Sequence, residues 1–324
     1  MAVARSWREP HHLDGPIRVR PEDIDPLNVV FSDAFTERYR RDGMVGVRVP
    51  SLNPSIWRYA IEDAADGAML WRDAQGQIAA FNIAHLSGEE GWMGPLAVRP
   101  DCQGSGAGKR IVRAGVEWLE KQGARIIGLE TMPRTMENIG FYSALGFLPK
   151  RLTITLTLDA SPGDRPVALL GRLSQRNRER TIEQCLSLVQ SLRPEYDFTR
   201  EIELTDRLSL GDTVLLRDGD DLTGFALCHT APLVEGRVRE ELRVLKLVLA
   251  RTDDVEAMAR LLKDFARRSG TRRVAIRIQG AYEEMYERLV ALGARVRWTD
   301  LRMTFAGRDE PVPEQGVILS NWEI

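Results

Sequence analysis

Apolar residues along the first half of the chain recur at two spacings, one typical of helices and the other of strands. Residues 111–122 carry apolar side chains on one helical face, and Gly123 ends that pattern. Residues 73–76 separate two apolar runs and have the composition of a hairpin turn. A helix is predicted to open at Pro21, and a short one at 137–145. The predicted strands of this half are 17–20, 69–71, 78–85, 92–98, 125–132 and 151–158.

The same order of elements recurs after a polar, turn-forming segment at residues 159–166. Ala144-Leu-Gly146 is echoed by Ala291-Leu-Gly293, and a β-rich run follows each. A single offset of roughly 150 residues relates the two halves, which predicts an internal duplication. The second half is predicted to hold helices over 182–192, 255–266 and 282–292, and strands over 213–217, 223–229, 242–250, 273–278 and 300–305.

The chain has 324 residues, enough for about two domains at roughly 150 residues each. We place the boundary between them in the polar segment, because linkers have this composition. The predicted divisions are an N-terminal arm (1–16), a first domain (17–158), a linker (159–166), a second domain (167–306) and a C-terminal tail (307–324).

Composition favours a small molecule or another protein as the partner, rather than nucleic acid or a membrane. Lys and Arg number 45 against 47 Asp and Glu, so the formal net charge is −2 and no basic excess is present. The three cysteines have neither disulfide-type pairing nor zinc-type spacing, which predicts no structural metal and a reducing, cytoplasmic location. Residues 1–16 hold no continuous apolar core typical of a signal peptide or membrane span.

A glycine-rich segment joins the apolar run at 92–98 to the helical pattern that follows it. Gly104, Gly106 and Gly108 lie within five positions of each other. Free N–H groups at a helix start, with no Cβ atoms in front of them, form a site for a phosphate. The segment lacks the Gly-x-x-x-x-Gly-Lys-Ser/Thr pattern of a P-loop and the Gly-x-Gly-x-x-Gly pattern of dinucleotide sites. Nucleotide-dependent ATPase and dehydrogenase functions are therefore excluded.

The segment Gln103-Gly-Ser-Gly-Ala-Gly108, preceded by Leu-Ala-Val-Arg-Pro, resembles motif A of the GCN5-related N-acetyltransferases, the GNAT superfamily. Residues 138–147 resemble a later motif of that family, Asn…Phe-Tyr-x-x-Leu-Gly-Phe, and residues 17–23 resemble its opening strand and helix. The resemblance implies an α/β (α+β) fold for each domain. In that fold a mixed, mostly antiparallel twisted sheet has helices on both faces and a V-shaped split between strands 4 and 5.

The resemblance also implies acetyl-CoA as co-substrate, no metal, and a role for each motif residue. The loop would cradle the pyrophosphate, and the backbone of the fourth strand would hold the pantetheine arm. Tyr142 lies at the position of the general acid, Asn138 at that of a cofactor ligand, and Glu130 where the family often has an acidic residue, here a candidate base. The other implied cofactor residues are Leu96, Ala97, Val98, Gln103, Gly104, Ser105, Gly106, Ala107, Gly108, Lys109 and Phe141.

Several roles stay open on the sequence alone. Tyr142 can instead be an aromatic residue that packs on the core. His85, Glu89 and Glu90 are alternative bases acting through water, and an amine can also lose its proton to solvent. The acceptor cleft is expected to be lined by loops at 43–57 and 86–91, whose composition does not specify the amine.

The second half keeps the order of elements but not the glycine loop. It has Thr252, Asp253, Asp254 and Glu256 there, and the three carboxylates would repel a diphosphate. We therefore predict a degenerate GNAT-like domain that does not bind coenzyme A. The tail offers one further possibility, a return of residues 321–324 to the first domain with Trp322 or the terminal carboxylate near the cleft.

The function implied by these patterns is transfer of an acetyl group from acetyl-CoA to a primary amine by direct attack in a ternary complex. The acceptor would be a small-molecule or peptide amine, and a homodimer is possible. The alternatives from other classes are an acyl-CoA sensor without turnover and a scaffold with a vestigial loop.

Overall fold

The computed structural model describes residues 12–164 and 166–324, so residues 1–11 of the predicted N-terminal arm lie outside it. The helices are α1 (Ile24–Arg41), α2 (Pro54–Ala64), α3 (Ala107–Lys121), α4 (Met136–Ser143), α5 (Gln175–Leu192), α6 (Thr199–Arg207), α7 (Val255–Arg268) and α8 (Glu283–Ala291). The strands are β1 (Asp14–Arg18), β2 (Ala68–Arg72), β3 (Ile78–Ser87), β4 (Glu90–Val98), β5 (Ile126–Thr131), β6 (Phe147–Asp159), β7 (Ala168–Leu169), β8 (Gly211–Asp218), β9 (Asp221–His229), β10 (Glu241–Leu249), β11 (Arg273–Gln279), β12 (Arg295–Phe305) and β13 (Val317–Ser320).

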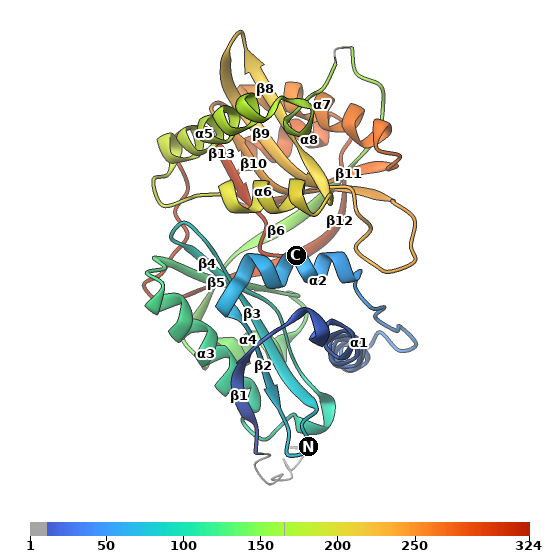
Figure 1. Ribbon diagram of the computed structural model, residues 1–324, viewed down its shortest axis with the longest axis vertical. Coiled ribbons are helices and arrows are strands. Elements are labelled where there is room, and N and C mark those ends of the chain that lie inside the picture. Colours follow the sequence, from blue (N-terminus) through green and yellow to red (C-terminus); the bar gives the residue numbers. More distant parts are fainter. Residues whose placement is uncertain (1–11, 165) are drawn as a thin grey trace.

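Helices cover both faces of one twisted sheet that runs through the two halves (Figure 1). The buried residues of α1, α2, α5 and α6 share a single hydrophobic core on one face. Two separate cores lie on the other face, one beneath α3 and α4 and one beneath α7 and α8. The strand pairs are antiparallel except β4–β5 and β10–β11. The predicted fold, a mixed and mostly antiparallel sheet with helices on both faces, is confirmed.

Four elements are missing from the sequence-based prediction, namely α2, α6, β7 and β13. The expectation of a loop throughout 43–57 is wrong because α2 begins at Pro54. The side chain of Asn53 accepts a hydrogen bond from the backbone N–H of Ser55 at 2.9 Å, and Pro54 occupies the first helical position. Asn before Pro is a standard helix start, so the signal was present in the sequence.

The two halves exchange their last long strands. β6, from the first half, pairs with β11 of the second, and β12, from the second half, pairs with β5 of the first. β6 and β12 also pair with each other at the centre of the sheet. We retain a division of the chain at residues 159–166 as a proposal, amended so that each half supplies a strand to the other.

Each half contains a place where two parallel strands separate. β4 and β5 pair from Glu90 and Ile126 as far as Met93 and Leu129, although both strands continue. This is the predicted V-shaped split. β10 and β11 separate in the same way beyond Arg243, 150 residues after Met93. There β13 pairs with residues 246–249 of β10, so the C-terminal tail fills the split of the second half.

Buried charges join the halves between β3, β10 and α6. Ser87 donates a hydrogen bond to Glu201, whose carboxylate also lies 3.6 Å from the ammonium of Lys246. Lys246 is 3.8 Å from Glu90 on its other side. Burial and the charge of Asp63 raise the pKa of Glu201 to about 7 despite Lys246. The folded state therefore holds a proton on Glu201 at pH values where the unfolded chain has lost it.

This raised pKa predicts that stability falls as pH rises through the window from about 4.5, the ordinary value for Glu, to about 7. Each pKa unit corresponds to about 1.4 kcal/mol, so the free energy of unfolding of the wild type should decrease by on the order of 3 kcal/mol across this window. We expect Glu201→Gln, which has no proton to lose, not to show this decrease. Urea unfolding at pH 5 and pH 8 checks the prediction. If the difference in unfolding free energy between variant and wild type is the same at both pH values, the prediction is wrong.

Candidate active site

The glycine loop between β4 and α3 presents bare backbone to open space. Gly104 has φ +84° and Gly106 has φ +90°, and a Cβ built on either would meet no atom within 4 Å. In the part of the chain that the structure describes, the backbone N–H groups of residues 104–109 form no hydrogen bond with protein atoms. An anion placed before the loop would therefore find unpaired donors at the start of α3.

Side chains of the loop turn inward and hold its shape. The Gln103 amide donates to the carbonyl of Val98 at 2.8 Å, and the Ser105 hydroxyl donates to the carbonyl of Cys102 at 2.8 Å. Cys102 itself is completely buried. Both polar side chains thus fix the turn, and the free amides face outward.

Positive charge accumulates on the first turns of α3. Lys109 and Arg113 are exposed, and neither forms an ion pair with any residue described. Arg110 is engaged elsewhere, since it donates to the carbonyls of Leu13 and Gly15 at 2.8 and 2.9 Å and so ties β1 to α3. Two unpaired cations beside a helix N-terminus are unfavourable for the helix dipole, and a bound anion would offset that repulsion.

The last residues of β4 offer a free backbone edge beside this loop. Leu96, Ala97 and Val98 pair with β3 on one side only, because β5 has already separated. The register between β3 and β4 shifts by one residue opposite Gly94 and Pro95, which bends the strand at the split. Gly94 and Pro95 thus lie in a β-bulge of β4.

Helix α4, which follows β5, lies beside the glycine loop. A Cβ built on Gly108 would lie 3.2 Å from the ring of Phe141, so the two predicted cofactor residues are in contact range. Asn138 donates a weak hydrogen bond of 3.4 Å to Thr131. The ring of Tyr142 is buried between Phe141 and Phe147, and its hydroxyl forms no hydrogen bond with a described residue. Burial raises the pKa of Tyr142, so the phenol is neutral near pH 7.

Glu130 lies in a network of ion pairs that spans both halves. Its carboxylate accepts hydrogen bonds from Arg302 at 2.9 Å, from Thr153 at 2.5 Å and from Arg277. Burial opposes ionisation, but the charges of Arg277 and Arg302 outweigh it and lower the pKa of Glu130 to about 2. Both arginines come from the second half, and the strand exchange places Arg302 directly opposite Glu130.

The other candidate bases are also engaged. His85 is fully buried, contacts Asp63 at 2.5 Å and the carbonyl of Gly94 at 3.2 Å, and stacks on Trp92. Glu90 is buried and accepts hydrogen bonds from the tail. Glu89 lies in the turn between β3 and β4, which packs on the second half, where its N–H donates to the carbonyl of Glu195. That residues 86–91 line the acceptor cleft stays a prediction, and the contacts of Gly88 and Glu89 show that the second half would border it there.

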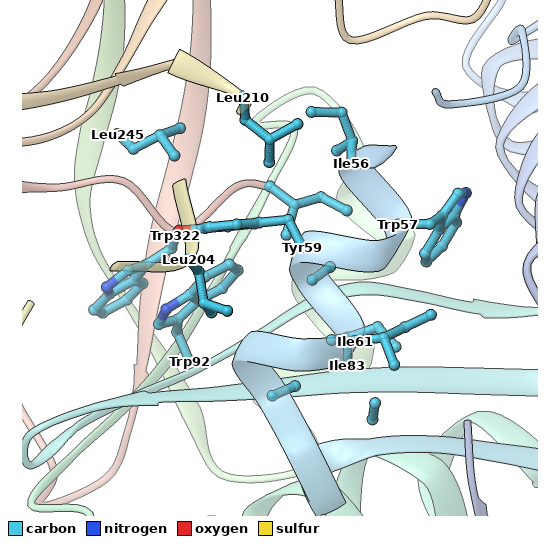
Figure 2. Close-up of a cluster of buried hydrophobic side chains, with 14 of the residues drawn as sticks. Ile56, Trp57, Tyr59, Ile61, Ile83, Trp92, Leu204, Leu210, Leu245 and Trp322 are labelled. Carbon is cyan, nitrogen blue, oxygen red and sulfur yellow. The ribbon is translucent and has the colours of Figure 1, made fainter. Parts of the chain in front are cut away.

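The sequence analysis missed most of what the C-terminal tail contributes. Beyond β13 the chain returns to the first half, where Trp322 packs beside Trp92 in the cluster beneath α2 and α6 (Figure 2). Its indole N–H donates to Glu90 at 2.8 Å, and only 2% of the residue is exposed. The expected return of the tail to the first half is confirmed, with Trp322 in contact with β4 and β5, although nothing in the local pattern of the tail specified this contact.

Residues 32–147 match the model of the acetyltransferase (GNAT) family. The first half of this chain is a GNAT-family domain. Over 72 residues the chain is 33% identical to the ribosomal protein bS18-alanine N-acetyltransferase of Escherichia coli K12, a match that covers 22% of this chain and 49% of that enzyme. The chain thus spans about half the length of the curated relatives it matches.

Solved structures support the tandem GNAT fold. A candidate acetyltransferase from Pyrococcus horikoshii has a TM-score of 0.69 and 15% identity, and the likeness covers 99% of this chain and 98% of that one. A tandem GNAT protein from the clavulanic acid biosynthesis pathway has a TM-score of 0.60 and 13% identity, covering 93% and 100%. At these identities the likeness concerns the fold. No helix within residues 12–164 and 166–324 is long and apolar enough to span a membrane.

Proposed function

We propose that the first half of the protein transfers an acetyl group from acetyl-CoA to a primary amine. The observation that carries the proposal is the row of unbonded amides at residues 104–109, which lies at the end of the free edge of β4. The amides suit a diphosphate, and the free edge suits the amides of a pantetheine arm. The family match to residues 32–147 supports acetyl-CoA as the donor.

Tyr142 is the general acid in this proposal. A neutral phenol without a hydrogen-bond acceptor in the protein can give its proton to a departing thiolate. The proton leaves with the thiol as the C–S bond breaks and the C–N bond forms. The low-dielectric surroundings of Phe141 and Phe147 favour the neutral phenol over the phenolate, so Tyr142 takes up a new proton from solvent before the next turnover. Direct attack in a ternary complex needs no covalent intermediate on the protein.

Glu130 does not deprotonate the acceptor amine in this proposal. A carboxylate with a pKa of about 2 is a weak base, so the contacts of Glu130 favour a structural role over deprotonation. The amine then reaches the site neutral by losing its proton to solvent. The name of the E. coli relative supports a peptide α-amine as one acceptor to test, beside small-molecule amines.

The second half does not bind coenzyme A in this proposal. β13 already pairs with the edge of β10 that corresponds to Leu96–Val98 of the first half, so a pantetheine arm has no free backbone there. The helix start after β10 carries Asp253, Asp254 and Glu256 instead of glycines. The stoichiometry of acetyl-CoA binding is therefore expected to be one per chain.

Replacing Gly106 with Ala tests the cradle. The added methyl group would project into the space before the amides, and we expect the Kd for acetyl-CoA to rise by about tenfold or more, a loss of about 1.4 kcal/mol. Gly123→Ala is the matched control. Its φ is +85°, its Cβ would also meet nothing within 4 Å, and it lies at the far end of α3. Both variants carry the same backbone strain, so only Gly106→Ala should weaken binding.

Isothermal titration calorimetry with acetyl-CoA measures both variants, and a thioester-consumption assay with a panel of amines measures turnover. Equal affinities in Gly106→Ala and wild type would contradict the cradle. Tight binding by the wild type without turnover on any amine would instead favour a sensor of acyl-CoA.

A further inference from the structure

The side chain of Trp322 lies where β4 and β5 separate. A Cβ built on Gly128 would come within 2.2 Å of the indole ring, so the ring rests directly on the backbone of β5. Gly128 pairs with Trp92 one step before the last pair of the two strands. The main-chain carbonyl of Trp322 lies 3.6 Å from a Cβ built on Gly94, so the tail contacts β4 as well.

The ring is held in place from three sides. Glu90, at the start of β4, accepts its N–H at 2.8 Å, and the guanidinium of Arg302 lies over the ring at 3.8 Å from its centre. Arg302 also donates to the carbonyl of Ser320 at 2.6 Å, which fixes the end of β13. Burial, these polar contacts and the absence of a Cβ at Gly128 together leave the ring no alternative position in a packed interior.

The tail connects the splits of the two halves. β13 occupies the split between β10 and β11, and two residues later the same chain places Trp322 at the split between β4 and β5. The C-terminal tail thus fills the split of the second half and also borders the split of the first half, on the face that α1 and α2 cover.

We propose that Trp322 is a positioning residue that sets the opening between β4 and β5 and seals its closed end against water. The inference rests on the proposed acetyl transfer. Trp322 would act through its contacts with Gly94 and Gly128. The backbone near Gly94 directly precedes the free edge of β4 that would hold the thioester end of the donor. Without the ring, the acceptor side of the split would be wider, and water could reach the thioester.

Trp322→Ala tests this role. We expect the Kd for acetyl-CoA to stay within about threefold, since the cradle at residues 104–109 is untouched, and kcat with an amine to fall by about tenfold to a hundredfold, the cost of misplacing reacting groups. Hydrolysis of acetyl-CoA in the absence of an amine should rise. Trp322→Phe keeps a ring over Gly128 and should recover most of the transfer rate.

Gly128→Ala supplies a second, independent variant, because its methyl group would displace the ring. We expect it to reproduce the kinetic pattern of Trp322→Ala, and the double variant to be no worse than either alone. Leu262→Ala, in the core of the second half, lowers stability without contact with the split and should leave kcat, corrected for folded protein, unchanged.

Hydrogen exchange gives a readout that does not need activity. In Trp322→Ala, peptides spanning β4 and β5 should exchange faster than in Leu262→Ala. Unchanged exchange, or unchanged kcat and hydrolysis, would overturn the role of Trp322 while leaving wild-type acetyl-CoA binding intact. Failure of the wild type to bind acetyl-CoA would overturn the proposed function, and this role with it.

Discussion

Replacing Tyr142 with Phe is expected to lower kcat by about 10²- to 10³-fold while leaving the Kd for acetyl-CoA nearly unchanged. The substitution removes one oxygen atom, and that oxygen forms no hydrogen bond with any residue that the structure describes. The ring contacts with Phe141 and Phe147 remain. The free energy of unfolding should therefore change little, and the loss should be confined to the chemical step.

Steady-state kinetics with a thiol-detecting reagent measures this effect, and Tyr286→Phe is the matched control. Tyr286 lies on α8, the helix of the second half that follows the parallel strand β11 as α4 follows β5. The kcat of Tyr286→Phe should equal that of the wild type. A reduction of less than about threefold in Tyr142→Phe would show that the phenol packs on the core without donating a proton. Equal losses in both tyrosine variants would point to a general destabilisation.

Local sequence signals specify most of the fold and the cofactor side of the site. The pattern of apolar residues predicts β2, β3, β4 and α3 to within a few residues. The two strands β2 and β3 are almost continuously buried apolar runs on either side of turn residues, and α3 buries one face of helical period. The glycines that enter positive φ mark the loop directly, because few other residues adopt that conformation. Signals of this kind depend only on neighbours along the chain.

The acceptor side depends on contacts that no local signal encodes. β6 and β12 have strand patterns that are compatible with pairing inside their own half, and the register opposite β5 and β11 is decided only when both halves are present. Glu130 looks like an isolated acidic residue in a strand until Arg302 is placed across from it. Gly128 looks like a weak point in a strand until the ring of Trp322 lies on it. The strand exchange thus brings side chains of the second half beside β5 of the first half.

The buried ion pairs of Glu130 lead to the largest predicted decrease in the free energy of unfolding. Glu130→Ala would remove the carboxylate that joins Arg302 to Arg277. Arg302 would keep its ion pair with Glu310, and Arg277 would keep those with Asp300 and Glu323. Breaking a buried ion pair by removing one partner costs about 3–5 kcal/mol when the remaining charge is uncompensated, and with these other carboxylates in place we expect a loss at the lower end, about 3 kcal/mol. Chemical unfolding measures the loss. Glu89→Ala is the control, since the surface pair of Glu89 with Arg125 should contribute at most about 1 kcal/mol.

Glu130→Gln separates the structural role from the catalytic one. The amide of Gln keeps the shape of the side chain but removes its charge. If Glu130 only positions the two halves, the free energy of unfolding falls, while kcat per folded molecule stays near that of the wild type. If Glu130 is instead the general base, kcat falls by about 10²- to 10⁴-fold, and activity should recover as pH rises and the amine loses its proton unaided. A pKa of about 2, fixed by two guanidinium groups that the second half supplies, favours the first outcome. The pH dependence of kcat in Glu130→Gln at pH values where the variant is fully folded decides between them.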